Sequence, residues 1–127
     1  MLSDREKKRY SRHLLLADIG EAGQLKLSQS KVLIVGLGGL GSPVALYLAA
    51  AGIGKLLLAD GDSLDITNLQ RQILFDTDSA GEQKAELAEE RLSGLNPEIE
   101  LEAIDQALTE EDLGEYVPEV DLVLDCS

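Results

Sequence analysis

The glycines near residue 36 have the spacing of a phosphate-binding loop. Gly36, Gly38 and Gly41 form a G-x-G-x-x-G pattern with Gly39 inside it, directly after the apolar run 31–35. Such glycines let the backbone turn tightly and approach a phosphate at the amino end of the next helix. The pattern alone is a weak signal, because a glycine turn also allows a helix to pack closely on a strand. Its position between a strand-like and a helix-like segment favours nucleotide binding.

An acidic residue lies where a nucleotide site needs one. Asp60 ends a second apolar run, about 20 residues past Gly41, the separation at which a carboxylate accepts hydrogen bonds from ribose hydroxyls. The glycines and Asp60 by themselves point to a nicotinamide or flavin dinucleotide. The alternative interpretation is that Asp60 is only a loop residue.

Two cations favour a triphosphate over a dinucleotide. Arg71 lies in the segment 68–72, which Asn68 opens, and Lys84 opens the helical pattern that follows. A dinucleotide needs few cations, whereas a triphosphate carries about four negative charges that Arg and Lys side chains neutralise. Taken singly, each cation is also explained as an exposed, solubilising charge. Taken together, Arg71 and Lys84 are expected to face the phosphate site.

The elements that must position these residues alternate between strand and helix. Their predicted order is strand 31–35, helix 42–51, strand 55–60, short helix 68–74, helix 83–92, strand 98–104, a helix from Thr109, and strand 120–126. The apolar runs predict buried strands, and the alternating apolar and acidic residues of 98–104 predict a strand near an edge. This order predicts an α/β fold, a Rossmann-like, doubly wound and mainly parallel sheet. A strand order of 3-2-1-4 places the last carboxyl end beside the glycine loop.

The length of 127 residues predicts a single domain. Residues 1–30 carry mixed charged and apolar residues broken at Gly20 and Gly23, which predicts an amino-terminal arm of one or two short helices outside the sheet. Residues 31–127 are then the β-α-β nucleotide-binding part. Arg12 lies in the arm.

The composition excludes several classes of function. A net charge of −13 argues against nucleic-acid binding, which depends on Lys and Arg. No apolar run reaches the roughly 20 residues that cross a membrane, and no signal peptide opens the chain, so a cytoplasmic location is expected. The single cysteine, Cys126, cannot form an internal disulfide or a paired-cysteine zinc site, and no metal site is predicted. Carboxylates dominate from residue 82 onward, which indicates a solvated face or, alternatively, a partner-docking surface.

Several motifs together resemble one family. They are Arg9-Tyr10-Ser11-Arg12, the run from Val35 to Gly41, Asn68-Leu69-Gln70-Arg71-Gln72, Lys84, and the ending Leu122-Val123-Leu124-Asp125-Cys126. Over essentially its whole length the chain resembles the ThiF, MoeB and HesA family of ubiquitin-activating-like enzymes. The segment 68–72 is far more specific than the glycines.

The resemblance implies an activity and assigns roles. Such enzymes use ATP to adenylate the carboxyl-terminal glycine of a ubiquitin-like sulfur-carrier protein, in thiamine or molybdopterin biosynthesis. By position, Asp60 matches the ribose-binding acid, and Asn68, Arg71 and Lys84 match residues of the phosphate site. Arg12 matches an arginine that reaches the nucleotide from the other subunit of a dimer, so the resemblance implies a homodimer.

The resemblance also marks what this sequence lacks. An Asp-Asn pair follows the Asp-Cys-Ser step in the family, and its aspartate holds Mg²⁺; the sequence stops one residue earlier, and the paired zinc-binding cysteines are absent as well. The chain is therefore expected to be a fragment that holds most nucleotide contacts. Cys126 is expected to be a small buried strand residue, and His13 to be structural or exposed. Two alternatives stay open, a dinucleotide-dependent oxidoreductase fragment and a noncatalytic nucleotide-binding fragment.

Overall fold

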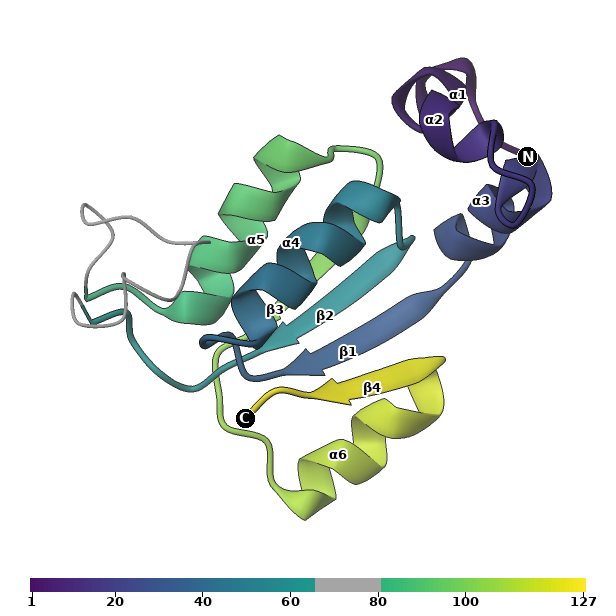
Figure 1. The fold of residues 1–127 in the computed structure, drawn as a ribbon. Helices are drawn as coiled ribbons and strands as arrows, with labels where there is room; N and C mark the ends of the chain where they lie inside the picture. Colours follow the sequence, from purple (N-terminus) through teal and green to yellow (C-terminus); the bar gives the residue numbers. More distant parts are fainter. Residues whose placement is uncertain (66–80) are drawn as a thin grey trace.

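A four-stranded parallel sheet forms the centre of the protein in the computed structural model, which describes residues 1–65 and 81–127 (Figure 1). The strands are β1 (Lys31–Val35), β2 (Lys55–Ala59), β3 (Glu100–Ile104) and β4 (Leu122–Asp125). Their spatial order is β3-β2-β1-β4, and all three pairs are parallel. The predicted α/β class and the 3-2-1-4 order are confirmed.

Helices cover both faces of this sheet, as a doubly wound fold requires. The helices α4 (Gly41–Ala51) and α5 (Lys84–Leu95) cover one face, and α6 (Glu110–Tyr116), followed by the short 3-10 helix η3 (Val117–Glu119), covers the other (Figure 1). Alternate strand residues supply the two cores because successive side chains point to opposite faces. Val32 and Ile34 pack toward α4 and α5, whereas Leu33 belongs to the cluster that α6 completes.

Local sequence signals set the limits of these elements. Helix α4 ends at Gly52, whose φ of +92° is the left-handed conformation that favours glycine after a helix. Helix α6 starts with a capping box in which Thr109 and Asp112 satisfy each other's backbone N–H groups. In β3 the residues alternate between exposed glutamates and half-buried apolar side chains, so the predicted edge position is correct.

Three short helices form the amino-terminal arm: α1 (Asp4–Arg9), α2 (Ser11–Leu14) and α3 (Gly20–Ser28). The prediction of one or two helices broken at Gly20 and Gly23 was wrong in detail, because α3 starts at Gly20 and continues through Gly23. The arm precedes β1 and lies at the amino ends of the strands (Figure 1). It is thus at the opposite end of the sheet from the glycine loop.

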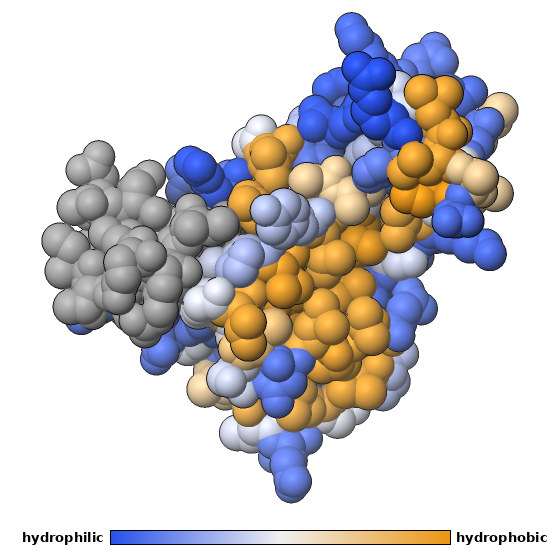
Figure 2. Space-filling view, viewed as in Figure 1, coloured by the Kyte–Doolittle hydropathy of each residue, from blue (hydrophilic) through white to orange (hydrophobic). Residues whose placement is uncertain are grey.

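The predicted short helix 68–74, with Asn68 and Arg71, lies outside the described residues. Among the helices that are described, none is long and apolar enough to cross a membrane. Figure 2 shows that apolar side chains gather on the viewed face over β1 and β4. In the described part of the chain, β4 pairs only with β1, so its outer edge is open.

Candidate nucleotide-binding site

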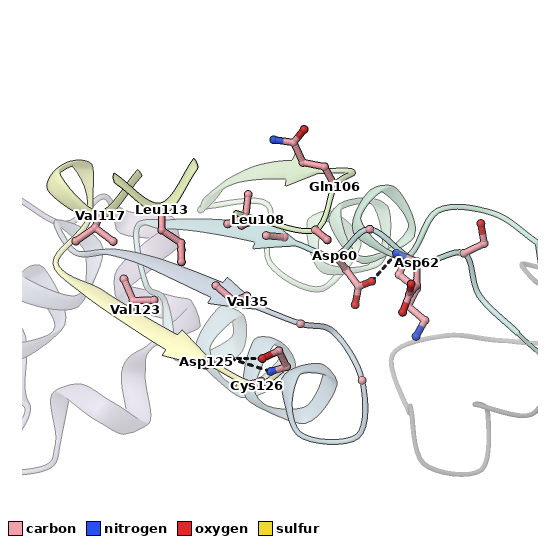
Figure 3. Close-up of a pocket in the computed structure, with 18 of the residues that line it drawn as sticks. Val35, Asp60, Asp62, Gln106, Leu108, Leu113, Val117, Val123, Asp125 and Cys126 are labelled. Atoms are coloured by element: carbon pink, nitrogen blue, oxygen red, sulfur yellow. Dashed lines mark hydrogen bonds between the residues drawn. The ribbon is translucent and has the colours of Figure 1, made fainter. Parts of the chain in front are cut away.

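A cleft of about 1080 Å³ opens at the carboxyl ends of the strands (Figure 3). Six parts of the chain line it: the glycine loop after β1, the segment after β2, the start of α5, the segment between β3 and α6, the helices α6 and η3, and the end of β4. The chain leaves the carboxyl end of β1 toward α4 on one face of the sheet and the carboxyl end of β3 toward α6 on the other, so these two segments diverge. The cleft lies where the strand order predicted a ligand site.

The glycine loop is packed too tightly for side chains at two positions. Gly36 has a φ of +96°, and a Cβ there would lie 2.8 Å from the carbonyl oxygen of Cys126. A Cβ on Gly41 would overlap the carbonyl oxygen of Gly36. The Ser42 hydroxyl closes the turn by donating to the Leu37 carbonyl over 2.8 Å. Gly36 and Gly38 line the cleft, so bare backbone faces the ligand space.

Asp60 holds the glycine loop as well as lining the cleft. Its Oδ2 accepts a hydrogen bond from the Leu37 N–H at 2.8 Å, and its Oδ1 accepts one from the Asp62 N–H at 2.8 Å. A carboxylate offers about four lone-pair sites, so acceptor capacity is left for a ligand. Sequence spacing placed Asp60 at this edge but missed its bond to the glycine loop. Its role toward ribose stays a prediction.

Lys84 is buried at the cleft, with 5% of its surface exposed. Its backbone N–H donates to the Asp62 carbonyl at 3.1 Å, and the neighbouring Gln83 forms a β-bridge with Ser63. These contacts fix the start of α5 beside the segment after β2. Within the described residues, the Lys84 ammonium has no hydrogen bond or ion pair. A cation at the cleft that has no partner among the described residues is available to bind an anionic ligand there.

The end of β4 forms one wall of the cleft. The Asp125 carboxylate accepts hydrogen bonds from the Ser127 N–H and hydroxyl, which lower its pKa. Burial, and then the negative charge of Asp125, raise the pKa of the Cys126 thiol. Cys126 is half-buried just past the strand, so the expectation of a small buried strand residue holds only in part. The thiol is therefore in its neutral form at physiological pH.

The other half of the cleft is apolar. Leu113, Val117 and Val123 lie at one end, and Asp60 and Asp62 at the other (Figure 3). An apolar pocket next to polar groups suits a ligand with a flat apolar part and a charged part. The residues predicted from the sequence are glycines and polar or charged residues, so this apolar half was missed. The signal that was available is the apolar side of the helix after Thr109.

Arg12 is not among the residues that line the cleft. It is exposed on α2, in the arm at the far end of the sheet (Figure 1). Asn68 and Arg71 lie outside the described residues, so the expected joint placement of Arg71 and Lys84 stays a prediction. Among the described residues, no group of three or more His, Cys, Asp or Glu side chains could hold a metal ion. His13 is half-buried and bonded to Gln24, which agrees with a structural role.

The ThiF family model matches residues 10–127. The chain belongs to the ThiF family. It is 53% identical, over 99% of its own length, to the sulfur carrier protein ThiS adenylyltransferase of Escherichia coli K12 and covers 50% of that protein. It is 47% identical to the molybdopterin-synthase adenylyltransferase of Haemophilus influenzae, again over 99% of the chain, and covers 52% of it. The ThiF-family chain therefore spans about half the length of these curated relatives.

Solved structures of ThiF-like proteins have the same fold. The tRNA N6-threonylcarbamoyladenosine dehydratase of Escherichia coli, crystallised in complex with ATP, superposes with a TM-score of 0.92 at 32% identity. That match covers 100% of this chain and 52% of the dehydratase. The protein MccB of Escherichia coli, crystallised with ATP, matches with a TM-score of 0.79 at 35% identity, over 95% of this chain and 36% of its own. The Rossmann-like assignment and the family resemblance are confirmed.

Proposed function

We propose that the cleft binds ATP and that the full-length protein adenylates the carboxyl-terminal glycine of a ubiquitin-like sulfur-carrier protein. The observation that carries this proposal is Lys84, a mostly buried side chain at the cleft whose ammonium has no hydrogen bond or ion pair among the described residues. A polyphosphate supplies the negative charge that this position lacks. Relatives named as sulfur-carrier and molybdopterin-synthase adenylyltransferases support the choice of reaction.

The proposed reaction requires positioning more than covalent chemistry from the protein. The carrier carboxylate attacks the α-phosphorus of ATP, a new acyl–phosphate bond forms, and the bond to the departing pyrophosphate breaks. Negative charge moves onto the pyrophosphate, so a cation near the outer phosphates stabilises the transition state. Lys84 takes this role, with Arg71 and Asn68 as its proposed companions. Backbone N–H groups of the glycine loop hold the phosphates.

Nucleoside recognition is divided between the two halves of the cleft. Asp60 accepts from the ribose hydroxyls with the lone pairs that Leu37 and Asp62 leave free. The apolar end formed by Leu113 and Val123 receives the base. Under this proposal, residues 31–127 are the nucleotide-binding half of one adenylation domain, and residues 1–30 are its arm.

The described residues do not by themselves build a magnesium site. Asp60 already accepts two backbone hydrogen bonds and Asp125 two from Ser127, and no cluster of three ligating groups exists in this part of the chain. Mg²⁺ is therefore proposed to enter as the Mg–ATP substrate, whose phosphates and waters supply most of the ligands. No zinc site is proposed for these residues.

A second copy of the chain completes the proposed site. Helix α2, which carries Arg12, lies at the end of the sheet opposite the chain's own cleft, which is compatible with the role that the family resemblance implies for Arg12 at another subunit's nucleotide (Figure 1). We propose a homodimer in which each Arg12 enters the partner's cleft.

The test is calorimetric titration of the full-length protein with Mg–ATP and, separately, with NAD, followed by ATP–pyrophosphate exchange. The proposal expects saturable ATP binding, no NAD binding, and exchange that depends on a carrier ending in glycine. Binding of NAD alone would favour the oxidoreductase alternative. Binding of ATP without exchange, with sulfur carriers of both the thiamine and the molybdopterin type, would favour the noncatalytic alternative.

A further inference from the structure

Two amide side chains are completely buried between the arm and the nucleotide-binding part. Asn96, after α5, and Gln24, in α3, are both 0% exposed, and each makes one hydrogen bond that joins the two parts. Packing alone would hold two apolar surfaces together without fixing their angle. Buried hydrogen bonds are directional, because a misplaced amide would be left unsatisfied.

Asn96 joins the junction between α1 and α2 to helix α4. Its Nδ2 donates to the Tyr10 hydroxyl and to the Ala49 carbonyl of α4, each at 2.8 Å, and its Oδ1 accepts from the Glu98 N–H. Tyr10 is itself only 2% exposed. The Tyr10 ring also lies against Gly52, where a Cβ would approach its Cζ to 2.6 Å. The position of Tyr10 is therefore fixed from two sides.

Gln24 joins α2 to helix α4 in a similar way. Its Nε2 donates to the Ala51 carbonyl at 2.9 Å, and its Oε1 lies 2.9 Å from Nδ1 of His13. The His13 and Tyr10 rings are stacked, with an interplanar angle of 7°. Both amides thus bond to carbonyls at the carboxyl end of α4 and hold two stacked rings, one at the junction of α1 and α2 and one in α2.

Arg12 lies between these two rings in the chain. Arg12 is exposed and has no ion pair or hydrogen bond to any described residue. Its neighbours are held in place, Tyr10 by Asn96 and His13 by Gln24. Anchoring the backbone beside an exposed side chain that contacts nothing in its own chain adds no contact to the fold. It does favour binding to a ligand outside the chain, because a fixed backbone lowers the entropy lost when the guanidinium binds.

We propose that Asn96 and Gln24 are positioning residues that act through Tyr10 and His13 to hold Arg12 in the orientation required by the partner subunit's cleft. This inference rests on the proposed function, in which Arg12 acts on the nucleotide of the other subunit. It adds that the two buried amides determine how much Arg12 contributes to the rate of the reaction in the other subunit.

Two mild variants test the inference in the full-length protein. Tyr10→Phe removes one hydroxyl and keeps the ring, and His13→Phe keeps a ring for stacking while losing the bond to Gln24. Each should lower kcat/KM for carrier-dependent ATP–pyrophosphate exchange about three- to tenfold, the loss expected for one hydrogen bond. The control is Lys7→Gln, which removes the exposed ion pair to Glu21 within the same arm and should change nothing.

A double-mutant cycle separates positioning from general stability. If Tyr10 acts through Arg12, Tyr10→Phe should cause no further loss in an Arg12→Ala background. Independent, multiplying losses would overturn the inference, as would unchanged activity of both mild variants.

Mixing subunits distinguishes this failure from failure of the proposed function. Arg12→Ala and Lys84→Met chains, each weak alone, should regain activity when mixed, because one site of the mixed dimer is intact. Recovery together with additive Tyr10→Phe losses would refute only the positioning role. Absence of recovery would refute the action of Arg12 across the dimer, and absence of exchange in the unmutated protein would refute the adenylation reaction; either result removes the role assigned to the amides.

Discussion

Replacing Lys84 with methionine should separate the stability of the empty protein from its affinity for ATP. Methionine fills a similar volume without charge. Because the Lys84 side chain is mostly buried and its ammonium has no ion pair within the described residues, the substitution breaks no ion pair there and places apolar atoms at a mostly buried position. We therefore expect the nucleotide-free variant to unfold at the same temperature as the unmutated protein or at a higher one.

ATP binding should change in the opposite direction. A hydrogen bond between an ammonium and a phosphate contributes about 2 kcal/mol, so Lys84→Met should weaken ATP about 30-fold. At ATP equal to about 100 times the original Kd, ligand binding stabilises the unmutated protein by about 2.7 kcal/mol and the variant by about 0.9 kcal/mol. At about 3 °C per kcal/mol, the ATP-induced rise in Tm falls from about 8 °C to about 3 °C.

The assay is thermal unfolding of the full-length protein with no nucleotide, with AMP and with ATP. AMP lacks the outer phosphates, so its Tm increment should be almost unchanged by Lys84→Met. The matched control is Lys55→Met, which removes a lysine 3.7 Å from Glu102 at the amino ends of the strands, away from the cleft. Equal losses for AMP and ATP, or a large loss of stability without nucleotide, would refute the placement of Lys84 at the outer phosphates.

Three further outcomes are expected. Asp60→Asn keeps one acceptor but turns an NH₂ group toward a backbone N–H, so it should lower the free energy of unfolding by about 2 kcal/mol in denaturant titrations and weaken ATP and AMP alike. Gly36→Ala places a Cβ against the backbone at a positive φ and should cost about 1–3 kcal/mol while abolishing ATP binding in calorimetry. The hydrogen bond and the charge of Asp105 raise the pKa of Glu86, so repulsion between the two carboxylates destabilises the protein at neutral pH and is relieved on acidification. Glu86→Gln should therefore raise Tm at neutral pH, and this gain should vanish as the pH falls toward the ordinary pKa of a carboxyl group.

The sheet could be predicted because its signals are local. Each central strand is a continuous apolar run, and the glycine turn shows where β1 ends and α4 begins. The alternation of β3 revealed its edge position because one of its faces is wetter. The order of the strands followed from the parallel crossovers, which leave few arrangements.

The side-chain contacts of the site could not be predicted in the same way. Spacing placed Asp60 at the end of β2, but nothing local indicates that its Oδ2 bonds to Leu37, 23 residues earlier. Asn96 and Tyr10 are 86 residues apart, and no periodicity links them. Helix positions in the arm failed for a related reason. The helices α1 and α2 meet at Tyr10, which makes a tertiary hydrogen bond to Asn96. Gly23, which was predicted to break a helix, lies inside α3.

Topology determines where the cleft lies, and a few residues determine what it can hold. Helices α4 and α5 cross on one face of the sheet and α6 on the other, so the chain must leave a crevice between the ends of β1 and β4 whatever side chains it carries. Bare backbone at Gly36 lines that crevice, as does Lys84, and under the proposed function they admit a phosphate and favour several phosphates over one. Substitutions in the sheet should therefore alter the stability of the protein and leave its nucleotide preference intact. Substitution of Lys84 should instead alter the preference between ATP and AMP with little effect on the fold.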